Sequence, residues 1–101
     1  MSDLAFGAKQ TYEEYYVEFN FVNDLAEEDT VATATVVAMD GVVDVTDTLT
    51  DVDEQTISGT SVFVWVMGGS TGVTYVITCQ IVSSVYGEKY EAEADLPVLE
   101  T

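Results

Sequence analysis

The acidic residues between positions 44 and 54 are the first candidates for chemistry, because carboxylates are the ligands that hard cations prefer. They are Asp44, Asp47, Asp51, Asp53 and Glu54. Calcium is bound by several oxygen ligands, but this spacing does not match an EF-hand, and no glycine stands where that loop turns sharply. The stretch therefore favours a solvated acidic loop and no cofactor, with calcium binding as the alternative.

The chain has few residues suited to the common catalytic mechanisms. Serine and threonine are abundant, but the 101-residue sequence has no histidine to activate a hydroxyl nucleophile. Paired carboxylates could cleave glycosidic bonds only in a pocket that raises the pKa of one partner, and nothing in the pattern points to one. The glycine-rich segment 68–72 lacks the lysine of a phosphate-binding loop, and no helix is expected after it. We predict no catalytic residues and a protein that is not an enzyme.

Aromatic side chains are the better candidates for function. Phe63, Trp65 and Met67 alternate along one strand and share a face, which favours packing in the core. The alternative is an aromatic patch covered by a partner subunit, because aromatic residues and methionine are enriched at interfaces. Tyrosines near strand starts and turns are similar candidates. The predicted interface residues are Tyr12, Tyr15, Tyr16, Trp65 and Tyr86.

The single cysteine, Cys79, lies inside an apolar strand pattern. A buried, unreactive thiol is favoured over an intermolecular disulfide or a reactive thiol, because free cysteines are among the most buried residues. No disulfide within the chain can form, so the sequence gives no sign of an oxidising compartment.

The charge balance limits the classes of partner. The chain has nineteen acidic residues and only two basic ones, Lys9 and Lys89, which gives a formal net charge of −17. Binding to nucleic acid or to anionic membranes depends on lysine and arginine, so neither is expected. The acidity fits a saline environment, in which salt screens repulsion between copies, or docking on a basic partner surface. No secretory signal or long apolar run is visible, so we expect a soluble protein made in the cytoplasm.

Short apolar stretches of period two predict a β-sheet protein. Val17, Phe19 and Phe21 share a face, as do Val62, Val64 and Val66, and such alternation is typical of strands. Valine, isoleucine, tyrosine and threonine dominate, and these residues suit a pleated surface. The expected strands are 12–22, 30–39, 42–45, 55–58, 61–67, 73–83 and one running from Tyr90 to Leu96. The acidic residues of 46–54 fall in a loop between two of them.

About seven strands at spacings near ten residues predict one all-β domain, an immunoglobulin-like antiparallel β-sandwich. The predicted boundaries are an N-terminal arm at 1–11, the sandwich at 12–98 and a short tail at 99–101. Leu25 is expected to be buried beneath the turn that follows the first strand. The strand at 30–39 is apolar on both faces, which predicts contact on both sides.

The order of several motifs resembles a known family. These motifs are Tyr16-Val17-Glu18-Phe19-Asn20-Phe21, Asp29-Thr30-Val31-Ala32 with its continuation to Val37, Gly41-Val42, Gly68-Gly69 with Gly72, Thr74-Tyr75-Val76-Ile77-Thr78, Ile81 and Gly87. Together they resemble the small fibre-to-tail adaptor proteins of tailed phages over about residues 9–98. The strongest part is 62–81. The chain departs from the family in having Phe19 and Phe21 where a tryptophan is usual, and in its acidity.

The resemblance implies a virion structural protein with an immunoglobulin-like domain and no active site to carry over. Such a protein would lie at the tail or neck in a ring or in multiple copies, and would connect fibres or neighbouring tail proteins. An alternative use of the same sandwich is capsid decoration, or a surface module that binds the shell or host carbohydrate. Terminal segments could add a strand to a neighbour's sheet.

Overall fold

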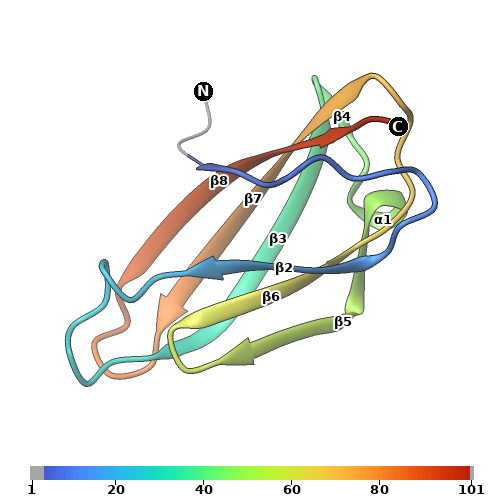
Figure 1. The fold of residues 1–101 in the computed structure, drawn as a ribbon. Helices are drawn as coiled ribbons and strands as arrows, with labels where there is room; N and C mark the ends of the chain where they lie inside the picture. The colour runs from blue at the N-terminus through green and yellow to red at the C-terminus, as the bar shows by residue number, and fades with distance from the viewer. Residues whose placement is uncertain (1–3, 101) are drawn as a thin grey trace.

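Two β-sheets packed face to face form the protein (Figure 1). The computed structural model describes residues 4–100. The larger sheet has the strand order β1-β8-β7-β3-β4, and the smaller one has the order β2-β6-β5. The elements are β1 Leu4–Ala5, β2 Tyr15–Asn20, β3 Val31–Asp40, β4 Val43–Asp44, α1 Thr46–Leu49, β5 Thr50–Ser58, β6 Ser61–Val66, β7 Val73–Ser83 and β8 Lys89–Val98.

The core lies between the sheets, where one face of each long strand is buried. The smaller sheet contributes the fully buried side chains of Val62, Val64 and Val66, which lie on β6. The larger sheet contributes Ile77 and Cys79 of β7 to the same core. The alternation that the sequence predicts for β2, β6, β7 and β8 is confirmed, as is the burial of Leu25. The all-β sandwich is therefore confirmed, and its layout is compatible with the immunoglobulin-like type.

Strand β3 departs from the expected contact on both sides. A β-bulge shifts its register against β7 between Val31 and Thr33. Val31 is buried, and after the bulge Ala34, Val36 and Ala38 are the residues that pack on the core. The prediction of contact on both sides was wrong because no layer among the described residues covers the outer side of β3, where Thr33 and Thr35 are exposed. The bulge decides only which residues face the core, since one extra residue moves every later side chain to the opposite face.

The acidic stretch at 46–54 is not a loop, as the sequence had suggested. It begins with the single helical turn α1 and continues directly into β5. Leu49 is buried and fixes the turn against the core, while the Asp44 carboxylate accepts hydrogen bonds from the amide and hydroxyl of Thr46. Burial of one leucine outweighs the poor helix propensity of threonine and aspartate over so short a segment.

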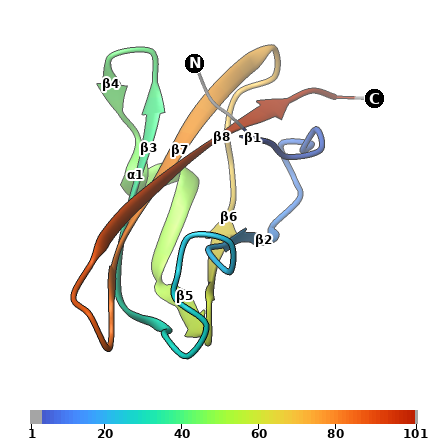
Figure 2. The same cartoon turned by 90° about the vertical axis from the view of Figure 1, so that its left-hand side faces the viewer.

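The N-terminal segment lies along the larger sheet. Strand β1 pairs in parallel with β8 (Figure 2). The Phe6 ring meets Phe19 edge-on at 5.4 Å. The C-terminal segment joins it, because the Leu99 amide donates to the Lys9 carbonyl and the Thr11 amide donates to Glu100 Oε1. Residues 1–3 of the expected arm and Thr101 of the expected tail lie outside the described residues.

Lys9 holds this segment to the rest of the fold. Its side chain is 0 % exposed, and Nζ donates to the carbonyls of Gly68 at 2.7 Å and Gln10 at 2.8 Å. Burial lowers the pKa of Lys9, and the neighbouring carboxylates of Glu13, Glu14 and Glu100 raise it only in part. A buried lysine is costly unless its charge is solvated by the protein, and here backbone carbonyls take that role.

Asp29 joins two loops at the other end of the sandwich. Its carboxylate is 2 % exposed, and Oδ1 accepts hydrogen bonds from the amides of Thr30 and Val85, each at 2.8 Å. Burial works to raise the pKa of Asp29, but the hydrogen bonds, led by the Val85 amide, lower it below its ordinary value of 3.8. The β2–β3 loop and the β7–β8 hairpin therefore depend on a charged carboxylate.

Gly69 is the glycine at which a side chain would do most damage. Its φ is +92°, and an added Cβ would lie 2.9 Å from Val98 Cγ2 and 3.2 Å from Tyr75 Cε2. We expect Gly69→Ala to lower the free energy of unfolding by about 2–4 kcal/mol, from backbone strain and overpacking together.

Gly72→Ala is the matched control, because φ is +84° there and nothing lies within 4 Å of the added Cβ. Urea unfolding of both variants checks the prediction. Equal losses in the two variants would show that the contact with Val98 contributes nothing.

No helix in the described residues is long and apolar enough to cross a membrane.

Candidate protein-binding surface

The outer face of the smaller sheet carries three aromatic side chains that we call the outer aromatic face: Tyr16, Phe63 and Trp65. Tyr16 of β2 lies directly opposite Trp65 of β6, and their rings meet edge-on at a centroid distance of 4.9 Å. The Tyr16 ring also meets Phe63 edge-on, at 6.4 Å. Because Val62, Val64 and Val66 turn inward, alternation along β6 places Phe63 and Trp65 outward.

This arrangement corrects the predicted core role of Phe63, Trp65 and Met67. Phe63 and Trp65 are half-buried and lie outside the core cluster, and Tyr16 is 43 % exposed. The continuous apolar run of β6 suggested burial on both sides, but no second layer covers the outer side among the described residues. The neighbours of Trp65 could not be known from the sequence, because they depend on the register between β2 and β6.

Carboxylates surround the outer aromatic face, and we call Glu18, Asp51 and Glu54 the acidic rim. Glu18 of β2 lies opposite Phe63 of β6, and Glu18 Oε2 accepts a hydrogen bond from the Ser61 hydroxyl at 2.5 Å. Asp51 of β5 lies opposite Trp65 on the other side. The Tyr16 hydroxyl donates to Glu54 Oε2 at 3.4 Å, reaching across β6 toward the bulged part of β5.

The other predicted interface residues lie elsewhere. Tyr12 is 94 % exposed and lines a shallow hollow with Glu13, Glu14 and Gly68. Tyr15 packs against the core, and burial, with a smaller contribution from Glu13, raises the pKa of its hydroxyl. Tyr86 is exposed in the β7–β8 hairpin, where its hydroxyl donates to Glu28 Oε1. Of the five, Tyr16 and Trp65 are in ring contact, and Tyr12 and Tyr15 line the same hollow.

The five acidic metal candidates do not converge. Asp44 is in β4, Asp47 is in α1, and Asp51, Asp53 and Glu54 are in β5. Hydrogen bonds from the Thr46 hydroxyl and amide lower the pKa of Asp44, so this carboxylate is already engaged within the chain. Among residues 4–100 no group of three or more acidic or cysteine side chains is placed to hold a metal ion.

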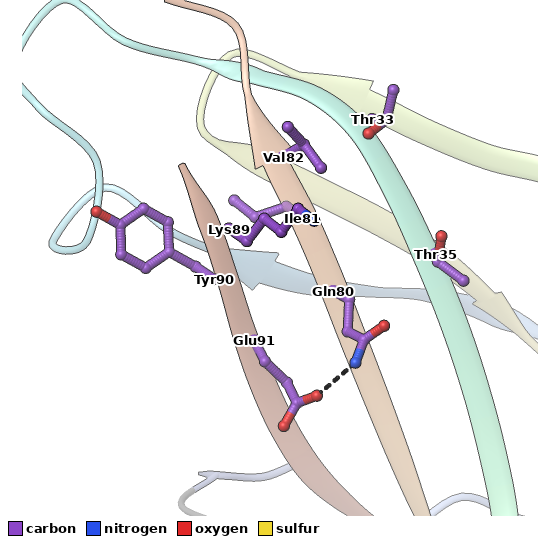
Figure 3. Close-up of a pocket in the computed structure, with 8 residues that line it drawn as sticks. All are labelled: Thr33, Thr35, Gln80, Ile81, Val82, Lys89, Tyr90 and Glu91. Carbon is purple, nitrogen blue, oxygen red and sulfur yellow. Dashed lines mark hydrogen bonds between the residues drawn. The ribbon is translucent and has the colours of Figure 1, made fainter. Parts of the chain in front are cut away.

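A shallow pocket of about 380 Å³ lies on the larger sheet (Figure 3). It is lined by side chains from β3, β7 and β8, among them Thr33, Thr35, Gln80 and Glu91. The only hydrogen bond drawn between its residues runs from Gln80 Nε2 to Glu91 Oε1, at 2.7 Å. Its hydroxyls come from Thr33, Thr35 and Tyr90, and none of them is hydrogen-bonded to another residue of the lining; the Tyr90 hydroxyl donates to Glu88 Oε1 instead.

Cys79 is buried, as the sequence predicts, and burial raises the pKa of its thiol to about 12. The thiolate is the nucleophile in thiol chemistry, so at pH 8 the native protein should not react with an aromatic disulfide reagent. Unfolding in concentrated guanidinium chloride should release one reactive thiol per chain. Full labelling of the native protein within minutes would contradict the buried placement.

The comparison with curated proteins finds no match for this chain. A family model does match, over residues 9–97, which include β2 to β7 and all of β8 except its last residue. The description of that family is "Podophage GP4 fiber-tail adaptor protein gp77". The match spans both sheets, the outer aromatic face and the acidic rim, so the resemblance drawn from the sequence is confirmed, and the chain belongs to this family of podophage fibre–tail adaptors.

Proposed function

We propose that this protein is a structural adaptor of the virion tail that holds fibres, or the tail proteins beside them, through protein–protein contacts and without catalysis. The proposal is carried by the outer aromatic face in a chain that belongs to a fibre–tail adaptor family. Aromatic residues at the centre of a contact supply much of the binding energy in protein interfaces.

An adaptor needs separate surfaces for its partners, and the sandwich offers them. The outer aromatic face lies on the smaller sheet, while Val42 and Val43 are exposed in the β3–β4 hairpin of the larger sheet. Val85 and Tyr86 are exposed at the opposite end, in the β7–β8 hairpin (Figure 1). The paired sheets hold these surfaces at fixed positions, so partners bound at the two ends would be held in a fixed relative placement.

Several copies around the tail would fit this role, since attachment at repeated sites turns weak contacts into a stable assembly. Each copy carries a formal net charge of −17, so copies repel one another in low salt. We therefore propose that the copies are arranged by their tail partners, after synthesis in the host cytoplasm, and that the free chain stays monomeric.

Electron microscopy of assembled particles tests this function. Antibody fragments against the chain should label the tail at the fibre bases, at a copy number matching the tail symmetry. Particles assembled without the chain should lack fibres. Label spread over the capsid shell, with fibres retained in its absence, would contradict the proposal and would support the decoration role instead.

A further inference from the structure

The geometry points to a specific partner chemistry: the outer aromatic face with its acidic rim docks an arginine-rich segment of another virion protein. This inference rests on the proposed adaptor function and adds to it the place of contact and the class of partner. The rings supply flat apolar surface, and the carboxylates beside them supply negative charge. A guanidinium group can stack on the first and pair with the second.

The aromatic part of the surface is ordered but incompletely covered. Tyr16 meets Phe63 and Trp65 edge-on, and these contacts hold the three rings in one arrangement. All three side chains nevertheless remain partly accessible on the outside of the sheet. A stacked group from a partner would therefore find rings already in position and would pay little ordering entropy.

Among residues 4–100, no lysine is paired with a carboxylate of the acidic rim. Lys9 is buried and its ammonium group donates to backbone carbonyls, and Lys89 lies on β8 of the other sheet. Glu18 and Glu54 each accept a hydrogen bond from a neutral hydroxyl, which leaves most of a carboxylate's acceptor sites available. A cationic partner would supply the positive charge that these carboxylates lack within the protein.

Other occupants fit less well. A second copy would bring a further −17 of charge and, in a symmetric dimer, would set the same carboxylates against each other. An apolar segment would strip water from Glu18 and Asp51 without offering them a partner. Arginine suits the surface better than lysine, because its planar group both stacks on rings and pairs with carboxylates through two hydrogen bonds.

Trp65 is the only tryptophan, so its fluorescence reports directly on this surface. The probe is an eight-residue peptide that alternates arginine and glycine, compared with the same peptide carrying lysine or glutamate. We expect a saturable change in Trp65 emission with the arginine peptide, affinity several-fold lower for the lysine peptide, and no change with glutamate. An unchanged Trp65 signal with the arginine peptide would overturn the inference.

Two charge-matched variants separate local binding from long-range attraction. Glu18→Gln with Glu54→Gln removes two charges from the acidic rim, and Asp40→Asn with Glu91→Gln removes two from the larger sheet. The rim variant should bind the arginine peptide roughly tenfold more weakly, and the control less than threefold more weakly. Equal weakening in both would overturn the inference, because the peptide would then sense only total charge.

The peptide and labelling experiments together distinguish failure of this inference from failure of the adaptor function. If the peptide does not bind but antibody label still marks the fibre bases, the adaptor role stands and only the arginine-rich partner is rejected. If label is absent from the tail, the adaptor role itself is rejected.

Discussion

Replacing Lys9 with methionine should cost about 2–4 kcal/mol of the free energy of unfolding, because charge-assisted hydrogen bonds to Gly68 and Gln10 are lost. Methionine retains much of the apolar stem but cannot donate to either carbonyl. Relief from burying a charge offsets part of this loss, since burial already lowers the pKa of Lys9. The loss should appear in urea unfolding as a lower midpoint at an unchanged slope.

Lys89→Met is the matched control for this experiment. Lys89 is exposed at the start of β8, and its replacement gives the same change in net charge. Hydrogen exchange should also locate the effect, with faster exchange at the amides of Phe6 and Lys9, which donate to β8 carbonyls. Similar stability in the two variants, with unchanged exchange at Phe6, would contradict the proposed role of Lys9.

Asp29→Asn should destabilise the protein at neutral pH and should do so less as the pH falls. Asparagine can still accept at Oδ1 from Thr30 and Val85, but without the charge that strengthens those bonds. We expect a melting temperature lower by roughly 5–10 °C at pH 7.

The direction of the pH effect follows from the lowered pKa of Asp29. A carboxyl group whose pKa is lower in the folded protein than in the unfolded chain stabilises the fold fully at pH values above its unfolded pKa. This stabilisation is lost as the pH falls through the folded pKa. For Asp29, the stabilisation is therefore lost below about pH 3.8. The difference between wild type and Asp29→Asn should therefore be constant from pH 7 to pH 5 and shrink below pH 4. Taking the difference cancels the other acidic groups, and a gap that widens in acid would contradict the account.

The sequence predicted the parts of the fold that depend on side-chain alternation. Strand β7 was predicted with the bounds that it has, Val73–Ser83, because apolar residues at every second position leave little choice of face. The stretch at 46–54 was predicted wrongly, because the burial of Leu49 decides its conformation and burial is a property of the whole fold. The same holds for the bulge after Val31, which no local pattern announces.

The candidate surface was predicted only in part. Tyr16 and Trp65 were both expected at an interface, but the sequence could not show that they touch, because contacts between strands depend on register. Phe63 was assigned to the core, and Glu18 was not among the predicted interface residues. Lys9 and Phe6 were placed in the N-terminal arm at 1–11, yet both contact residues far away in the sequence, Gly68 and Phe19.

The number of fibres on assembled particles tests the central claim most directly, since that claim is that the outer aromatic face holds a tail partner. Particles whose only copy of the chain is Tyr16→Ala with Trp65→Ala should carry few or no fibres, with the folded state checked by circular dichroism. Particles with Asp40→Asn and Glu91→Gln should carry the normal number, because those residues lie on the larger sheet. A full set of fibres on the aromatic variant would contradict the account.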